Sequence, residues 1–463
     1  MHTPDLLKAY YGEIEAAAIQ FDEKTTPSIH SYSPYIKKLT YLVAFNFLRI
    51  NYNLRDPVLI KIWINGGGKL IRIFSPNEVL ILTPEELDAL NDNNIQYGNV
   101  HIEIFHPQIK TPNSEFRFFT IYHSPSHSSA GVHSLGAMNL VDLGSNLGSR
   151  SILPIAESTF AHNPDQCIEI TRPKNKEFLA QADPINSSHN GPGFFSSIHD
   201  MQVRGVWHDS DLYHAVKRAK DPIKLCPLRQ SFPIVNFPES SPLIWISKDQ
   251  IGYLPKKLSI SIFNKHNLEL RKDEFVIEGN KTYINLRDFY KNESKQKYVY
   301  AIANFDADQG DFDSPALGYL HLYYQNKNKI SDQVHSQITP SFWTDTTKSL
   351  VPYRCRKFAP WINHSSQDWH YAIVNIGGNG ANKDEEIRFR IFTSDNKERV
   401  IDKQLLNETV SFFHGASLLK ELGLSDTKAA IFQIESETSN FNAFWVLEDK
   451  ESQSIGIDHF TGG

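Results

Sequence analysis

One pattern of residues recurs three times along this chain, and each time it ends on a histidine. A short apolar run is followed, roughly a dozen residues later, by His133, by His335 and by His459. A strand pattern that repeats with the same residue type after it indicates an architecture built from copies of one unit. We therefore expect three copies of a single folding unit.

The segments upstream of the three histidines agree in order. A proline-containing lead-in comes first, followed by an apolar strand, two alternating strands, a shorter apolar segment and a further strand. In the third copy Ile387, Phe389 and Ile391 alternate with Arg388 and Arg390. This period of two predicts a half-buried antiparallel strand whose apolar side chains point inward between two sheets. The long helical crossovers that parallel sheets need are missing.

Six or seven such strands per copy are typical of a two-layer sandwich. We therefore predict an all-β protein with three tandem immunoglobulin-like β-sandwich domains, a long irregular insertion between the first and second, and a short N-terminal helix. A length of 463 residues fits about three domains. The predicted segments are the N-terminal helix and lead-in 1–29, sandwich 30–134, insertion 135–230, sandwich 231–336, linker 337–354 and sandwich 355–463.

Composition bounds the partners and the compartment. A formal net charge of −6 and a pI near 6.3 give no general attraction to nucleic acid or to an anionic membrane. No apolar run approaches the length of a membrane span, and residues 1–21 carry acidic groups where a signal peptide needs an apolar core. Three scattered cysteines fit a reducing compartment. We expect a cytoplasmic protein without a cofactor, and export by another route stays open.

The insertion contains the densest group of polar side chains, namely Arg204, Trp207, His208, Asp209, Asp211, Tyr213 and His214. Here His208, Asp209 and His214 are candidates for metal binding or for a general base with its orienting partner. The same segment also resembles the strand lead-in Asp368-Trp369-His370-Tyr371 of the third copy. Because the spacing matches no specific metal motif, an irregular strand start with solvated side chains is the simpler interpretation.

Two further patterns suggest ligands but have simpler interpretations. Asp306, Asp308, Asp311 and Asp313 alternate as in a calcium loop, but the twelve-residue loop with its closing Glu is incomplete. A solvated hairpin tip accounts for them. The run Asn65-Gly66-Gly67-Gly68 resembles a phosphate cradle, yet it joins two strands, so a hairpin turn is predicted.

Two functional hypotheses follow. The first is a non-catalytic binding or scaffold protein that recognises a glycan or a protein partner. Its binding residues would be His133, His335 and His459, one per domain, although a histidine that hydrogen-bonds across the strand end is the simpler interpretation of each. Exposed tryptophans would stack on sugars or anchor an interface, with candidates Trp63, Trp361, Trp369 and Trp445.

The second hypothesis is a carbohydrate-active hydrolase or metal-dependent enzyme with its site in the insertion 135–230. The chain has no nucleophile elbow, Walker loop, dinucleotide fingerprint or zinc-binding HExxH. The binding hypothesis is therefore preferred. Open sheet edges would also permit self-association, and the chain resembles no family closely enough for residues to be transferred.

Overall fold

The computed structural model describes a set of strands, turns and short helices along the chain. These residues are 29–46, 57–64, 67–95, 97–105, 118–122, 130–133, 135–136, 228–238, 240–247, 257–276, 281–286, 296–305, 320–326, 329–330, 334–335, 355–375, 384–436, 442–451 and 454–462.

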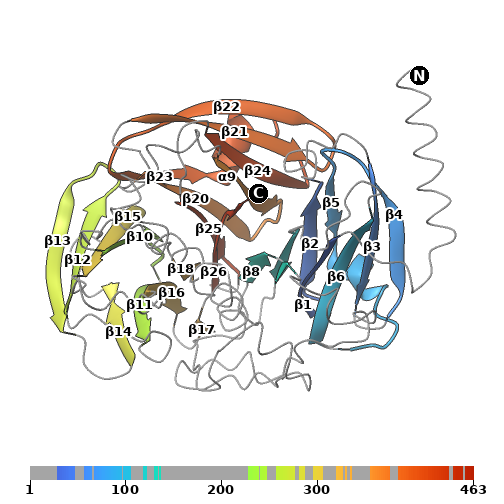
Figure 1. The fold of residues 1–463 in the computed structure, drawn as a ribbon, viewed down its shortest axis with the longest axis horizontal. Helices are drawn as coiled ribbons and strands as arrows, with labels where there is room; N and C mark the ends of the chain where they lie inside the picture. Colours follow the sequence, from blue (N-terminus) through green and yellow to red (C-terminus); the bar gives the residue numbers. More distant parts are fainter. Residues whose placement is uncertain are drawn as a thin grey trace, which may run out of the picture.

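The first stretch of chain forms two antiparallel sheets (Figure 1). We call such a pair of sheets a unit. One sheet has the order β4-β3-β6-β1-β9 and the other β5-β2-β7-β8. The elements of this first unit are β1 (Ile29–Ile36), β2 (Thr40–Phe45), β3 (Val58–Ile64), β4 (Lys69–Phe74), β5 (Val79–Leu82), α3 (Pro84–Asp88), β6 (Tyr97–Phe105), β7 (Phe118–Tyr122), β8 (Ala130–His133) and β9 (Leu135–Gly136).

The third unit repeats this topology element by element. Its sheets have the orders β22-β21-β24-β19-β27 and β23-β20-β25-β26. A short helix again follows the fifth strand. The elements are β19 (Cys355–Ile362), β20 (Gln367–Asn375), β21 (Glu385–Thr393), β22 (Glu398–Leu405), β23 (Thr409–His414), α9 (Gly415–Glu421), β24 (Ala429–Ser436), β25 (Asn442–Asp449), β26 (Ser454–His459) and β27 (Thr461–Gly462).

The second unit keeps the pairing of the first seven strands and differs at its end. Its sheets have the orders β10-β15-β12-β13 and β14-β11-β16-β17, and β18 also pairs with β16. The elements are β10 (Leu228–Val235), β11 (Ser241–Ser247), β12 (Lys257–Asn264), β13 (Glu269–Val276), β14 (Lys281–Asn285), β15 (Tyr298–Phe305), β16 (Leu320–Asn326), β17 (Lys329–Ile330) and β18 (Val334–His335).

The predicted all-β class with antiparallel sheets is confirmed. The pairing order refines it: the first strand of each unit bonds to the sixth and the seventh bonds to the second, whereas in a constant-type immunoglobulin domain the first strand joins the second. Two strands run past the predicted segment limits, since β9 lies beyond residue 134 and β10 begins before residue 231. The domain limits themselves, and the count in the immunoglobulin sense, stay predictions.

Two local predictions are confirmed as well. Ile387, Phe389 and Ile391 are fully buried, and Arg388 between them is exposed. β3 and β4 form an antiparallel hairpin, as predicted for the glycine-rich run. Gly67 lies in the turn of this hairpin, and a Cβ there would be 2.3 Å from the backbone oxygen of Leu90, which follows α3. The turn therefore approaches the backbone at Leu90 so closely that this position requires glycine.

The hydrophobic cores join the units to one another. One continuous buried cluster contains inward-facing residues of both the first and the third unit. Phe45 of the first unit lies with its ring centroid 4.6 Å from that of Phe392 in the third. A second cluster fills the second unit and continues onto the outward face of β20, β25 and β26. The third unit therefore packs against both others, as its central place in Figure 1 shows.

Burial along β20 reflects this position. From Trp369 to Asn375 every residue is buried. Trp369, Tyr371 and Ile373 belong to the core shared with the first unit, while Ala372 and Val374 belong to the core shared with the second. Successive side chains of a strand point to opposite faces, so this sheet is covered on both. Neither helix among the described elements has the length and apolarity to cross a membrane.

Candidate functional site at the junction of the second and third units

A group of ionisable side chains lies where the two-sided sheet of the third unit meets the second unit. Asp368 and His370 are two residues apart on β20 and therefore share one face. Glu448 on β25 lies directly opposite Asp368 in the register, and His414 at the end of β23 lies opposite His370. We call these four residues, together with Lys297 and Tyr298 of the second unit, the junction cluster.

The second unit supplies the other wall of the cluster. The hydroxyl of Tyr298, the first residue of β15, lies 3.1 Å from Nδ1 of His370. Lys297 Nζ lies 3.3 Å from a carboxylate oxygen of Glu448 and 4.3 Å from the centre of the Phe237 ring. The contact of Tyr298 with His370 and that of Lys297 with Glu448 cross from one unit to the other, while Phe237 belongs to the second unit like Lys297. The cluster is therefore assembled only when the two units dock.

His370 is the most buried member. Its side chain is 2% exposed, and burial lowers its pKa to about 3, with the negative charge of Asp368 offsetting part of that shift. The imidazole is thus neutral at pH 7. Its Nε2 atom has no hydrogen-bond partner among the described residues, and it lies 3.9 Å from Oδ2 of Asp368, which is too far for a hydrogen bond.

Asp368 is held by a hydrogen bond from His414 and by the charge of Lys450. His414 Nε2 donates to Oδ1, and Nδ1 of His414 lies 2.8 Å from the Ser417 hydroxyl, which fixes the ring. Lys450 Nζ lies 3.6 Å from Oδ2. Burial alone would raise the pKa of Asp368, but the hydrogen bond from His414 and the nearby positive charges outweigh it and lower that pKa. Burial and the charges of Asp368 and Glu448 raise the pKa of Tyr298.

This arrangement has the chemistry of a metal site or of an acid–base pair. One ligand atom each from Asp368, His370 and Glu448 lie within 4.8 Å of one another. An imidazole with a free nitrogen beside two carboxylates suits transition metals that accept nitrogen and oxygen ligands. The same His–Asp neighbours would suit proton transfer, but His370 is too deeply buried for a substrate to reach easily.

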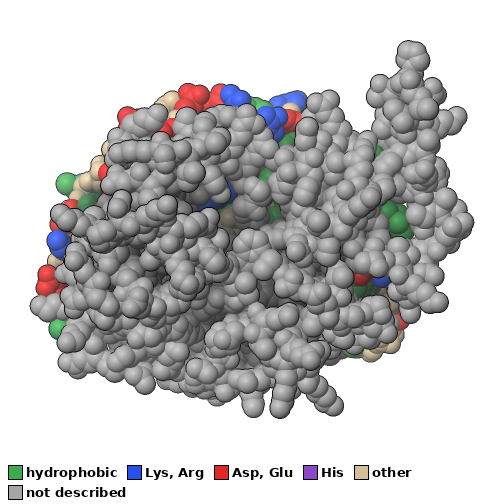
Figure 2. All heavy atoms as spheres, in the orientation of Figure 1, with side chains coloured by type: hydrophobic (Ala, Val, Ile, Leu, Met, Phe, Trp, Pro, Cys, Tyr) green, Lys and Arg blue, Asp and Glu red, His purple; other side chains and the backbone are tan. Residues whose placement is uncertain are grey.

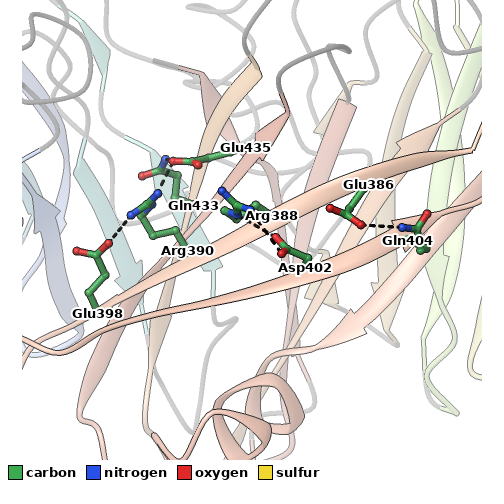
Figure 3. Close-up of polar contacts among 8 residues, drawn as sticks. All are labelled: Glu386, Arg388, Arg390, Glu398, Asp402, Gln404, Gln433 and Glu435. Carbon is green, nitrogen blue, oxygen red and sulfur yellow. Dashed lines mark hydrogen bonds and ion pairs between the residues drawn. The ribbon is translucent and has the colours of Figure 1, made fainter.

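A second polar group lies on the outward face of the other sheet of the third unit and behaves differently. Figure 3 shows its side chains paired across β21, β22 and β24: Arg388 with Asp402, Arg390 with Glu398 and Glu435, Gln404 with Glu386, and Gln433 with Glu435. Most are exposed, and acidic and basic groups gather along the rim over β22 (Figure 2). Charges of both signs on such a face keep it solvated.

The three repeated histidines lie on corresponding strands, each paired with the seventh strand of its unit. His133 is opposite Phe119, His335 is opposite His321, and His459 is opposite Phe444. β26 packs against both β8 and β18, so the three strands meet near the centre of Figure 1. Their side chains lie outside the described part of the structure, and their role in binding stays a prediction.

The prediction that four tryptophans are exposed is wrong. Trp63, Trp361, Trp369 and Trp445 are all 5% exposed or less. An indole carries a large apolar area, and burying it between sheets stabilises the core more than display would. Trp361 and Trp369 line the start of α9, where a Cβ on Gly415 would lie 3.2 Å and 3.3 Å from them. None of the four offers a platform to a ligand in this conformation.

The remaining predicted site residues fall outside the described ranges. These are His208, Asp209 and His214 of the insertion and Asp306, Asp308, Asp311 and Asp313. The sequence alone does not identify the junction cluster, because the segment with Asp368 and His370 is typical of a strand lead-in. Their Asp-x-His spacing, which puts both on one strand face, was a usable signal. No signal in the sequence points to Glu448 or Tyr298, because they lie 80 and 70 residues away from Asp368 and nothing near Asp368 indicates that they contact it.

No protein-family model and no curated protein matches this chain. Among solved structures, a calcium-binding mutant of Bacteroides uniformis β-glucuronidase 2 aligns at 10% identity over 51% of this chain and 26% of its own, with a TM-score of 0.14. The Bacteroides uniformis β-glucuronidase aligns at 9% identity over 55% and 28%, with the same TM-score. A structure of the receptor tyrosine kinase Torso aligns at 10% identity over 55% and 84%, with a TM-score of 0.10. This chain thus spans about a quarter of the β-glucuronidases, and TM-scores this low bear on neither fold nor function.

Proposed function

We propose that this chain is a non-catalytic binding or scaffold protein whose units form one stiff body that presents its outer surfaces to a partner. The observation that supports this most is the sheet β23-β20-β25-β26, which is buried on both faces between two cores. Units linked by continuous apolar cores move together, whereas units linked by small polar interfaces do not. A stiff multi-unit body loses little entropy when it binds, which favours a scaffold role.

Burial of the tryptophans supports a protein partner over a glycan. Sugar recognition by stacking needs an exposed aromatic face, and Trp63, Trp361, Trp369 and Trp445 are buried. The outward strands β13 and β22 carry mixed charges, with Leu268 (63% exposed) and Leu406 (55% exposed) next to their ends. Charged rims around isolated apolar residues suit recognition of another protein.

The alternative is a hydrolase or metal-dependent enzyme that uses His208, Asp209 and His214. A paired experiment separates the two functions. The full chain and its His208→Ala and Asp209→Ala variants are screened for turnover of polysaccharides, for binding on a glycan array, and for crosslinked protein partners. We expect no turnover and a protein partner that binds all three proteins equally. Turnover that His208→Ala abolishes would overturn the scaffold proposal, and so would glycan binding without a protein partner.

A further inference from the structure

Two carboxylates in the junction cluster are placed where they repel each other. Asp368 and Glu448 are direct cross-strand neighbours on β20 and β25. Like charges in this position destabilise a sheet unless a cation lies between or beside them. Each side chain is only 20% exposed, so water screens the repulsion incompletely. The site therefore requires positive charge.

Two lysines supply positive charge near the carboxylates, but they are weakly held. Lys450 and Lys297 contact the two carboxylates at 3.6 Å and 3.3 Å, and their side chains are 59% and 40% exposed. Ion pairs of exposed lysines contribute little to stability, so either lysine can rotate into water at small cost. Neither lysine reaches Nε2 of His370, which stays without a hydrogen bond among the described residues.

The buried Nε2 is the observation that points to a ligand. A buried polar atom without a partner is costly, and an ion or a water is one of the recognised explanations for such an atom in a native protein. The ring presents Nε2 toward Asp368 while Nδ1 faces the hydroxyl of Tyr298. When Nδ1 carries the proton and donates to that hydroxyl, Nε2 has a free lone pair. Metal-binding histidines are held in this way by a partner on the other ring nitrogen.

The spacing fits an ion of small radius. Zinc binds nitrogen and carboxylate oxygen at about 2.0–2.2 Å, which separates neighbouring ligand atoms by about 3.4 Å in a tetrahedron. The three donor atoms lie within 4.8 Å of one another, and Nε2 is 3.9 Å from Oδ2. Side-chain rotations that move each atom by less than about 1 Å close this difference. His414 holds only Oδ1 of Asp368, so Oδ2 is left for the ion.

We propose that Asp368, His370 and Glu448 bind one divalent transition-metal ion of the zinc class at the junction of the second and third units. Calcium and magnesium are disfavoured, because they take oxygen ligands and the site offers an imidazole nitrogen. Tyr298 and His414 act as positioning residues. The ion replaces Lys297 and Lys450 as the positive charge and joins β20 to β25 beneath the second unit. This goes beyond the scaffold role, since it assigns a metal ion to two strands of the third unit at its contact with the second.

The test uses the full chain, treated with a chelator and then titrated with zinc chloride in competition with a chromophoric chelator. We expect one zinc per chain, and on the order of tenfold weaker binding or more in Glu448→Gln and Asp368→Asn. These amide variants keep side-chain shape at sites that are partly exposed, so they preserve folding. The matched control is Asp402→Asn, which alters a carboxylate in the outer charged face of the same unit and should leave the affinity unchanged.

A second variant moves the affinity in the opposite direction. Lys450→Met removes a cation that competes for Asp368, so zinc should bind this variant more tightly. Cobalt bound in place of zinc should show the visible absorption of an ion with nitrogen and oxygen ligands. The proposal is overturned by the absence of zinc binding up to about 100 μM, far above the affinities of structural zinc sites. It is also overturned by zinc that Glu448→Gln and Asp368→Asn both retain, or that only His208→Ala removes, which would assign the ion to the insertion.

Discussion

The two sheets of the third unit share one core but meet different surroundings on their outward faces. In the sheet β23-β20-β25-β26 the outward face is apolar and is buried against the second unit, through residues such as Ala372, Val446 and Ile457. In the sheet β22-β21-β24-β19-β27 the outward face carries Arg388 and Arg390 in paired charges. The inward faces of both sheets contribute buried residues to the core shared with the first unit.

This difference shows what an uninterrupted apolar strand means in this protein. β21 alternates buried and exposed residues from Glu385 to Phe389, because its outward face meets solvent there, whereas Phe392 further along is covered by Phe45 of the first unit. From Trp369 onward β20 is buried without interruption, because both of its faces are covered. Where polar groups still occur on the covered face, as at Asp368 and His370, they are held by specific partners from another unit or another strand. Polar groups on the open face need no such partners, since they can form hydrogen bonds with water.

The inward face of β21 should give the largest effect. Phe389 is fully buried in the core shared by the first and third units. We expect Phe389→Ala to lower the free energy of unfolding by about 3–5 kcal/mol, because it removes apolar contacts and leaves a cavity. Urea denaturation followed by tryptophan fluorescence measures this. Arg388→Ala, on the opposite face of the same strand, is the control and should change it by less than about 0.5 kcal/mol.

A loss below about 1 kcal/mol for Phe389→Ala would mean that β21 is shifted by one residue, which exchanges its two faces.

Truncating one apolar side chain on each outward face should change the free energy of unfolding by clearly different amounts. Ile457 on β26 is 1% exposed against the second unit, whereas Val400 on β22 is 42% exposed. We expect Ile457→Ala to cost about 2–4 kcal/mol and Val400→Ala less than about 0.5 kcal/mol. Equal costs would show that the junction between the second and third units does not form in solution. Thermal unfolding of both variants, measured side by side, decides this.

The first unit offers a titratable group on a covered outward face. His101 on β6 is 1% exposed and stacks on Trp63 with ring centroids 4.8 Å apart. Burial, with a smaller contribution from the charge of Lys61, lowers its pKa from 6.5 to about 3. The unfolded chain therefore binds a proton at this residue between pH 6.5 and pH 3 that the folded chain does not, so stability falls as the pH falls through this window.

We expect the titration of His101 to lower the free energy of unfolding by on the order of 1–2 kcal/mol between pH 7 and pH 5. The loss is about 1.4 kcal/mol for each pH unit below 6.5. Burial raises the pKa of the neighbouring Glu103, which acts in the opposite direction closer to pH 4.5. His101→Gln keeps Glu103 and removes only the histidine, so its stability should depend less steeply on pH than that of the wild type. Identical slopes in chemical denaturation at pH 7, 6 and 5 would show that His101 is solvated.

Local patterns in the sequence predicted the strands well. Alternation at Ile387, Phe389 and Ile391 predicted the face that is buried, and the glycine-rich run after Ile64 predicted the β3–β4 hairpin. Such patterns succeed because strand geometry is set by neighbouring residues with a period of two. The tryptophans failed for the complementary reason. Whether an aromatic side chain of a strand is buried depends on what packs over it, and Trp63 on β3 has a covered outward face that alternation alone does not reveal.

The sequence by itself determined that the chain is all-β and that one strand order is written three times, because turn residues and hydrophobic period are local properties that each copy carries independently. Only the tertiary structure decided that the third unit is packed between the other two and that Asp368, His370 and Glu448 face Tyr298 and Lys297. Residues tens of positions apart meet there through strand register and unit docking. Both depend on the sum of many weak apolar contacts over whole faces, so no short segment of the sequence encodes them.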